Sequence, residues 1–203
     1  VGNPNTGKTT VFNALTGSKQ YVGNWPGVTI DKKYGFINKD IKIVDLPGIY
    51  AMDTYSNEEK VSRAYLENED VDLIINVVDA TNLERNLYLT TQLMQFNKPI
   101  LVLLNMMDIA NKRGLNINTD MLAEKLGVSI LQISAKKKTG LENISEEINK
   151  AIEIIPNYNI KFDTENDAYS YIDGLIKESS KVSGKSNYIG EKIDKVVLNP
   201  ILA

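Results

Sequence analysis

The apolar residues of this chain fall into short continuous runs that alternate with segments of helical spacing. Continuous runs with the length of strands buried on both faces occupy residues 73–78, 100–104 and 129–133. Helical spacing predicts amphipathic helices over residues 9–16, 83–96, 119–126 and 141–154. A Ser-x-x-Glu capping box at Ser56 predicts the start of another helix, and residues 32–38 and 41–45 predict an antiparallel hairpin.

This order of elements predicts an α/β fold. Strands that alternate with helices and are joined by short loops favour right-handed crossovers and a parallel sheet. We therefore expect a mainly parallel six-stranded sheet with helices on both faces, followed by a short helical appendage with helices over residues 168–182 and 188–198. In such sheets ligands bind at the C-terminal ends of the strands, so this edge is where functional residues are expected.

Composition narrows the chemistry that is open to the chain. Its 203 residues are enough for a sizeable core, and the net charge of −3 gives no general attraction for nucleic acid, which we do not expect as a partner. The one basic cluster, residues 136–138, is interpreted as a solvated loop. The chain has neither cysteine nor histidine, which excludes disulfides and leaves acid–base chemistry to carboxylates, lysine, the substrate or bound ions.

The ends of the sequence carry two further expectations. No apolar run reaches the length needed to span a membrane, and no signal peptide precedes the first motif. The chain begins at Val1, where a buried strand should already be under way. We interpret the sequence as a fragment that lacks the initiator Met and most of its first strand.

The first eight residues carry the most informative motif. Residues 2–9 spell G-x-x-x-x-G-K-[ST], a phosphate-binding loop in which backbone N–H groups turn toward phosphate and Lys8 reaches the terminal phosphates. The amphipathic helix that follows points its N-terminus at the same anion. An ordinary glycine turn is the alternative for this motif taken alone.

Four further motifs follow in the order used by GTP-binding proteins. They are Thr29 in a glycine-rich loop (residues 18–30) that we expect to be mobile, Asp45-x-x-Gly48, Asn105-x-x-Asp108 and Ser134-Ala135-Lys136. Each alone is explained by a helix cap or a turn. Together, at the ends of successive strands, they predict the P-loop GTPase fold and a GTP/GDP site.

The guanine base is assigned to the later motifs. Asp108 can accept two hydrogen bonds from guanine, and adenine has no such pair of donors, so this carboxylate selects GTP. Asn105 is expected to tie its loop to the phosphate loop, and the Ala135 N–H is expected to face the guanine oxygen.

The phosphates are assigned to the earlier motifs. Lys8 neutralises the transferring phosphoryl group, Thr9, Thr29 and Asp45 hold magnesium (Mg²⁺), and the Gly48 N–H senses the terminal phosphate. Loss of that phosphate would release Thr29 and Gly48, so the site is also a switch. The remaining residues that we expect to contact the nucleotide are Asn3, Asn5, Thr6, Gly7, Thr10, Gly27, Met106, Ser134 and Lys136.

Longer strings carry a resemblance to one family. Residues 2–5 (Gly-Asn-Pro-Asn), 22–29 (Val-Gly-Asn-Trp-Pro-Gly-Val-Thr), 45–50 (Asp-Leu-Pro-Gly-Ile-Tyr) and 76–90, which include Asn-Leu-Glu-Arg-Asn-Leu, resemble the cytoplasmic GTPase domain of FeoB, the bacterial ferrous-iron transport protein B. The resemblance covers roughly residues 1–154 and returns at 192–198. It implies a GTP-binding domain (1–155), a linker (156–166) and a shortened helical domain (167–203) that leads toward a transmembrane region.

The resemblance also implies function and partners. It implies a GTPase that regulates or powers ferrous-iron uptake from the cytoplasmic face of the inner membrane. Its partners would be its own permease region, small accessory proteins of the iron-uptake system and a second copy bound through the switch loops. A soluble GTPase of ribosome or tRNA maturation is a rival, and so is a binding switch whose hydrolysis is too slow to matter.

Two departures from the familiar small GTPases shape the expected mechanism. Ile49 follows Gly48 where a glutamine would orient water, so intrinsic turnover should be slow. In the family Asn5 is associated with potassium (K⁺), which switch-loop carbonyls near Asn24 and Trp25 would complete. We therefore expect Asn5 to act in catalysis with Lys8, Thr29 and Gly48. The alternative role for Asn5 is turn formation, and the alternative for Trp25 is plain packing. A separate departure is Met106, which stands where many GTPases have lysine and predicts fast GDP release.

Overall fold

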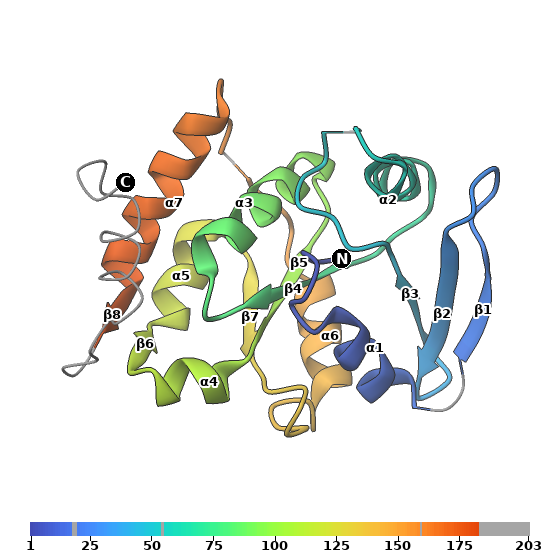
Figure 1. Ribbon diagram of the computed structural model, residues 1–203. Helices are drawn as coiled ribbons and strands as arrows, with labels where there is room; N and C mark the ends of the chain where they lie inside the picture. Colours follow the sequence, from blue (N-terminus) through green and yellow to red (C-terminus); the bar gives the residue numbers. More distant parts are fainter. Residues whose placement is uncertain (18–19, 54, 159, 183–203) are drawn as a thin grey trace, which may run out of the picture.

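The computed structural model describes residues 1–17, 20–53, 55–158 and 160–182, whose strands form three hydrogen-bonded sheets (Figure 1). The parallel sheet has the order β4 (Ile74–Asp79), β5 (Ile100–Asn105), β7 (Ser129–Gln132). An antiparallel sheet has the order β1 (Gln20–Asn24), β2 (Asp31–Ile37), β3 (Ile41–Asp45), and β6 (Leu115–Ile117) pairs with β8 (Ser180–Val182). The described helices are α1 (Lys8–Thr16), α2 (Asn57–Asn68), α3 (Leu83–Leu93) with the 3₁₀ turn η1 (Met94–Phe96), α4 (Met107–Lys112), α5 (Thr119–Leu126), α6 (Ile144–Ile152) and α7 (Glu165–Ser179).

Helices cover both faces of the parallel sheet, as predicted. All six residues of β5 are buried, and successive side chains alternate between two hydrophobic clusters. Leu101 and Leu103 belong to the cluster that includes residues of α1 and α6. Val102 and Leu104 belong to the cluster that includes residues of α3, α5 and α7. β5 is therefore held from both sides, and its C-terminal end has a fixed position.

Five of the six strands that we expected in one sheet are present, β2 and β3 in the antiparallel sheet and β4, β5 and β7 in the parallel sheet. On the edge of β4 that does not pair with β5, the described residues place Val1 and Gly2, with an isolated parallel bridge from Gly2 to Val77. A cavity of about 520 Å³ lies between β3 and β4, lined by apolar side chains of both strands and reaching Lys8. The fold class is as predicted, and the single six-stranded sheet is not confirmed, because no described strand joins β3 to β4 by a full hydrogen-bond ladder.

Several boundaries differ from the predictions. The Ser56 capping box is present, with Glu59 as its partner, and starts α2 as expected. Residues 20–24 form β1, although we expected a loop there, and the short elements α4 and β6 were not predicted. The helix expected over 168–182 ends at Ser179 and continues as β8, because residues 180–182 pair with 115–117. The helix expected over 188–198 lies outside the described residues.

The segment between the predicted domains contacts the parallel sheet region. Tyr158 donates a hydrogen bond of 3.1 Å to the Lys98 carbonyl, and α7 begins with a second capping box, formed by Thr164 and Asp167. The domain boundaries at 155 and 166 stay predictions. None of the helices in the described ranges is both long and apolar enough to cross a membrane.

Candidate functional site

The phosphate-binding loop has the backbone that its sequence predicts. Asn5 and Gly7 both adopt left-handed conformations, with φ of 68° and 85°, and Gly7 directly precedes α1. A Cβ atom at Gly7 would lie 2.5 Å from Asn105 Nδ2, so a larger residue would clash as well as strain the backbone. Thr9 and Thr10 are exposed in the first turn of α1. The loop therefore presents the start of a helix and its backbone N–H groups to solvent, a geometry that suits an anion.

Lys8 and Asp45 form an ion pair beside this loop. Asp45 ends β3, and the two side chains are 14% and 9% exposed. A phosphate group placed on the loop would offer the Lys8 ammonium a second anionic partner. The Thr9 hydroxyl and the Asp45 carboxylate supply oxygen atoms, which are the ligands that magnesium prefers, so these residues fit a magnesium–nucleotide complex.

Asn105 links the two ends of the site. Its Nδ2 donates to the Thr6 carbonyl at 2.8 Å, which is the tie to the phosphate loop that we predicted. Its Oδ1 accepts a hydrogen bond of 2.9 Å from the Ala135 N–H. The Ala135 N–H therefore already donates to Asn105. To contact the guanine oxygen as predicted, it must either donate to both oxygens or give up its hydrogen bond to Asn105.

Asp108 is oriented by two groups of the Ser134–Lys138 loop. The Ser134 hydroxyl donates to Asp108 Oδ1 at 2.9 Å, and Lys137 Nζ lies 3.6 Å from Oδ2. The Ser134 hydrogen bond, followed by the charge of Lys137, lowers the pKa of Asp108 below its ordinary value. The carboxylate is thus kept ionised, as recognition of two guanine donors requires.

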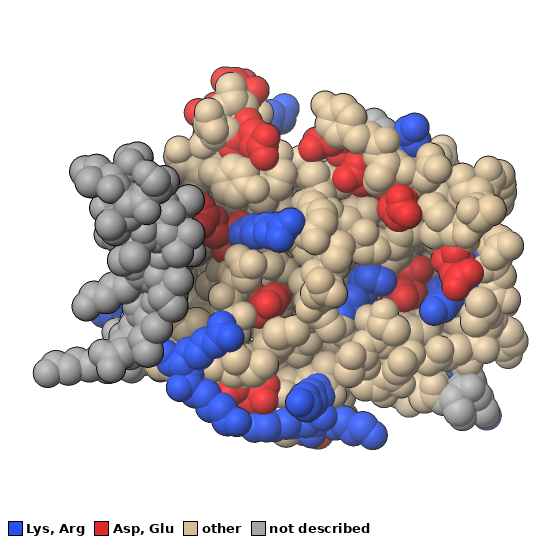
Figure 2. Space-filling model, in the orientation of Figure 1, with Lys and Arg blue, Asp and Glu red and all other residues tan. Residues whose placement is uncertain are grey.

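Lys137 is a contact that the sequence alone did not identify. The three consecutive lysines at 136–138 predict a basic loop, but the sequence alone does not show which of them faces Asp108. In the structure Lys137 faces it, and Lys136 is exposed. Figure 2 shows Lys and Arg side chains gathered along this edge of the molecule, near α4 and the loop at residues 134–140. Met106 has a left-handed backbone (φ 64°) at the start of α4. Its contact with the nucleotide stays a prediction.

The Asp45–Gly48 loop packs against the phosphate loop. A Cβ atom at Gly48 would lie 3.6 Å from Pro4, and the Ile49 N–H donates to the Gly2 carbonyl at 3.2 Å. Ile49 is buried, so its side chain does not reach toward the phosphates. Asn3 is buried as well and donates to the Arg85 carbonyl at 3.3 Å. Gly48 consequently lies beside the phosphate loop.

The residues of the switch loop are not assembled with the others. Asn24 ends β1 and is exposed, Gly27 and Thr29 are exposed, and Trp25 is buried in the core. Within the described ranges, no hydrogen bond joins any of these four residues to residues 2–9. The cause is the pairing of residues 20–24 with β2, which extends the hairpin and carries the loop to its tip (Figure 1).

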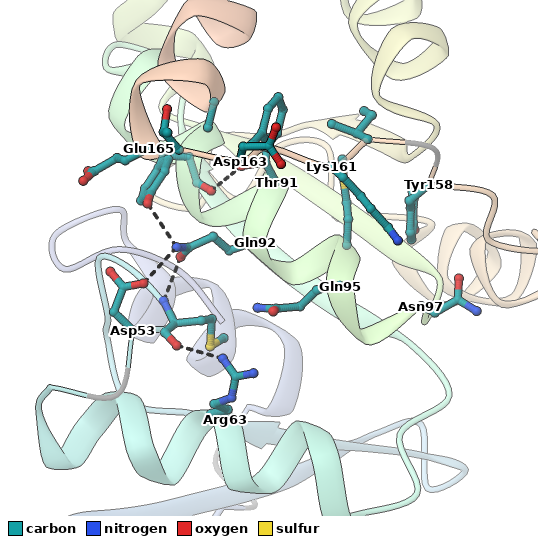
Figure 3. Close-up of a pocket in the computed structure, with 17 residues that line it drawn as sticks. Asp53, Arg63, Thr91, Gln92, Gln95, Asn97, Tyr158, Lys161, Asp163 and Glu165 are labelled. Atoms are coloured by element: carbon teal, nitrogen blue, oxygen red, sulfur yellow. Dashed lines mark hydrogen bonds between the residues drawn. The ribbon is translucent and has the colours of Figure 1, made fainter.

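A larger cavity lies away from these residues. Its volume is about 720 Å³, and it is lined by Met52, Asp53, α3 and residues 160–165. Figure 3 shows Gln92 at its centre, pointing toward Asp53. Gln92 Oε1 accepts from the Met52 N–H at 2.7 Å, and its Nε2 lies 3.3 Å from Asp53 Oδ1. None of the predicted site residues lines this cavity, and Gln92 instead fixes the chain that leaves Gly48 onto α3.

Comparison with known proteins gives matches along most of the chain. The family described as Ferrous iron transport protein B matches residues 1–148. The Fe(2+) transporter FeoB of Legionella pneumophila (strain Paris) is 47% identical over 155 residues, which are 73% of this chain and 21% of that protein. The chain thus spans about a fifth of the length of this relative.

Solved structures of similar proteins share the fold. The cytosolic domain of L. pneumophila FeoB matches with a TM-score of 0.80 and 34% identity, over 89% of this chain and 97% of that chain. A mutant of S. thermophilus NFeoB bound to GDP matches with a TM-score of 0.74 and 39% identity, over 99% and 82% of the two chains. The fold is that of a P-loop GTPase domain. By its sequence and its structure, the chain belongs to the family of ferrous iron transport protein B.

Proposed function

We propose that this chain binds GTP and hydrolyses it with magnesium, and that it is the cytosolic GTPase part of a ferrous-iron transporter. The observation that carries the proposal is the assembled base and phosphate site, in which Asn105 bridges Thr6 and Ala135 while Asp108 is held ionised. The S. thermophilus relative was solved with GDP, which supports a guanine nucleotide here.

A few residues at the phosphate end of the site would bind the phosphates and magnesium. Lys8 would exchange Asp45 for the terminal phosphates and neutralise the developing charge. Thr9 and Asp45 would hold magnesium directly or through water, and Thr29 would join them when the switch loop closes. Magnesium, when bound, polarises the phosphates for attack by water. Gly48 would offer its N–H to the terminal phosphate, and its closeness to Pro4 of the phosphate loop supports this role.

We extend the proposal to potassium and to slow turnover. Asn5 is exposed at the rim of the loop with a left-handed backbone, where its amide can reach a cation beside the phosphates. The Trp25 carbonyl accepts from the Val28 N–H at 3.3 Å and has a second lone pair with which it would serve the same cation. Buried Ile49 offers no side chain to orient water, which supports slow intrinsic hydrolysis.

The cellular setting of the proposal follows from the family. We propose residues 1–155 as the GTP-binding domain, 156–166 as a linker and 167–203 as a shortened helical domain that leads to a membrane permease. The chain would then work at the cytoplasmic face of the inner membrane. Its partners would be that permease region, small accessory proteins of iron uptake and a second copy through the switch loops. The L. pneumophila relative is named a transporter of Fe(2+), which supports this assignment.

The test is phosphate release from GTP and from ATP with magnesium, in matched potassium and sodium chloride. We expect selective cleavage of GTP that is faster in potassium, and Asn5→Ala should remove the potassium effect without abolishing GDP binding. A rate that ignores potassium would refute the cation assignment and leave a slow binding switch. Equal cleavage of ATP would refute the guanine assignment.

A further inference from the structure

An aromatic cluster holds the switch loop onto α2. The cluster consists of Trp25, Lys32 and Tyr65, which we call the clasp. The rings of Trp25 and Tyr65 meet edge to face with centroids 5.3 Å apart. Lys32 Nζ lies 4.7 Å from the Trp25 ring centroid and 5.6 Å from that of Tyr65. Only 6% of Trp25 is exposed, so the clasp fixes the start of the switch loop against the helix that follows the Asp45–Gly48 loop.

The clasp also controls the position of Thr29. The Trp25 N–H donates to the Ile30 carbonyl at 2.9 Å, and the Trp25 carbonyl accepts from Val28. Residues 25–30 therefore form a closed turn whose two ends meet at Trp25. Because Thr29 lies inside this turn and is exposed, its place is set by where the indole is anchored.

The docked indole has an uncompensated cost. Trp25 Nε1 is buried and, among the described residues, has no hydrogen-bond partner. A buried N–H without a partner loses its bond to water and gains nothing in return. Edge-to-face packing and the Lys32 cation favour the docked indole, while the unpaired N–H opposes it. Such a balance suits a contact that is made and released rather than a permanent part of the core.

We propose that the clasp is a latch that keeps Thr29 away from the phosphate loop, and that it opens when GTP and magnesium bind. This inference rests on the proposed function, because it takes Thr29 as a magnesium ligand. Tyr65 and Lys32 are then positioning residues, which act on the reaction only through Trp25 and the turn that it anchors. In this proposal the indole leaves Tyr65 when the switch loop closes.

Trp25 is the sole tryptophan of the chain, so its fluorescence reports the latch directly. The full chain is titrated with magnesium and either GDP or the β,γ-imido analogue of GTP, and emission and quenching by acrylamide are recorded. We expect a red shift and stronger quenching with the GTP analogue, and emission close to that of the free protein with GDP. Unchanged emission at saturating analogue would overturn the proposal.

Tyr65→Leu tests the latch without emptying the core. Leucine keeps apolar packing but removes the ring, so the free protein should already show red-shifted emission. The affinity for the GTP analogue should rise roughly two- to tenfold, the range that corresponds to one aromatic pair, with GDP affinity unchanged. Lys32→Met should act in the same direction with a smaller effect. A fall in analogue affinity would mean that the clasp supports the closed loop, which contradicts the proposal.

Tyr21→Leu is the matched control. Tyr21 lies on the same hairpin and stacks on Tyr34 with centroids 4.9 Å apart, but it is 53% exposed and outside the clasp. It should change neither the emission of Trp25 nor the analogue affinity. If the wild-type chain bound neither GDP nor the GTP analogue, the proposed function itself would fail. If the chain bound GDP and the GTP analogue tightly but the Trp25 emission did not change, only the latch would be refuted.

Discussion

The two ends of the candidate site differ in how firmly hydrogen bonds hold their residues in place. At the base end, both polar atoms of the Asn105 side chain are hydrogen-bonded, and Asp108 is oriented by Ser134 and Lys137. At the switch end, Thr29 is exposed at the tip of a hairpin with no hydrogen bond to residues 2–9 in the described part of the chain. The residues proposed to recognise the base are thus held by hydrogen bonds, whereas, among the described residues, those proposed to respond to the terminal phosphate are not joined to the phosphate loop by hydrogen bonds.

The supporting strands account for this difference. β5 pairs with β4 on one side and β7 on the other, and all of its residues are buried. β1 is an edge strand with four of its five residues exposed. Opening a local segment costs little where few apolar contacts are lost, so the hairpin is the part that can rearrange. The residues proposed to select the base therefore follow the buried strand β5, and those proposed to act as a switch follow the exposed edge strand β1.

Asp108→Asn should have the largest effect, because it breaks the preorganised end. The amide N–H of the new side chain would face a donor of guanine, which is unfavourable. Xanthine carries a carbonyl oxygen at that position, which can accept a hydrogen bond from the amide. We expect the preference for GDP over XDP to fall by about 10⁴-fold. Competition binding with GDP and XDP measures this change. Retained guanine preference would show that Asp108 does not read the base.

Thr29→Ala should affect only the switch end. The loss of a magnesium ligand that is recruited late should lower phosphate release from GTP by about 10²-fold. GDP affinity should stay the same, since Thr29 is remote from the loop in the free chain. Single-turnover hydrolysis and GDP titration separate the two effects, and Thr29→Ser should restore most of the rate. An equal loss of GDP affinity would remove the distinction between the ends.

Gly7→Ala should disturb the link between the ends. The new Cβ would meet Asn105 Nδ2 at 2.5 Å on top of the strain at φ 85°, so we expect a loss of about 3 kcal/mol in the free energy of unfolding. Gly17→Ala is the control, because Gly17 has φ 62° and no atom of the described residues lies within 4 Å of the added Cβ, which leaves strain alone at about 1–2 kcal/mol. Urea unfolding of both variants measures the difference. Equal losses would show that contact with Asn105 is unimportant.

Ser134→Ala should have the smallest effect. Without the hydroxyl donor, the pKa of Asp108 should rise toward 3.8, its ordinary value. A carboxyl group is ionised above its pKa and becomes protonated as the pH falls through that pKa. Because the pKa of Asp108 is higher in the variant, base recognition should be lost at a higher pH than in the wild type. GDP affinity at neutral pH should fall several-fold. The carboxyl carbon shift of Asp108, followed by NMR over a pH series, checks the direction.

Much of the site could be predicted from the order of the motifs. The tie from Asn105 to the phosphate loop and the strands that end at Asp45 and Asn105 were expected, because apolar runs and strand-end motifs are local signals. The contacts of Lys137 and Gln92 were not predicted. Each depends on which of several equivalent polar residues faces a group distant in sequence.

The sequence by itself determined the chemistry of the site. Glycine at position 7, lysine at 8 and the carboxylates at 45 and 108 are needed by type and spacing, and those are readable in one dimension. Only the tertiary structure decided which of them are assembled. The glycine-rich switch segment pairs as an edge strand, and Trp25 is anchored by a ring on α2, because long-range packing overrides the local preference for a loop.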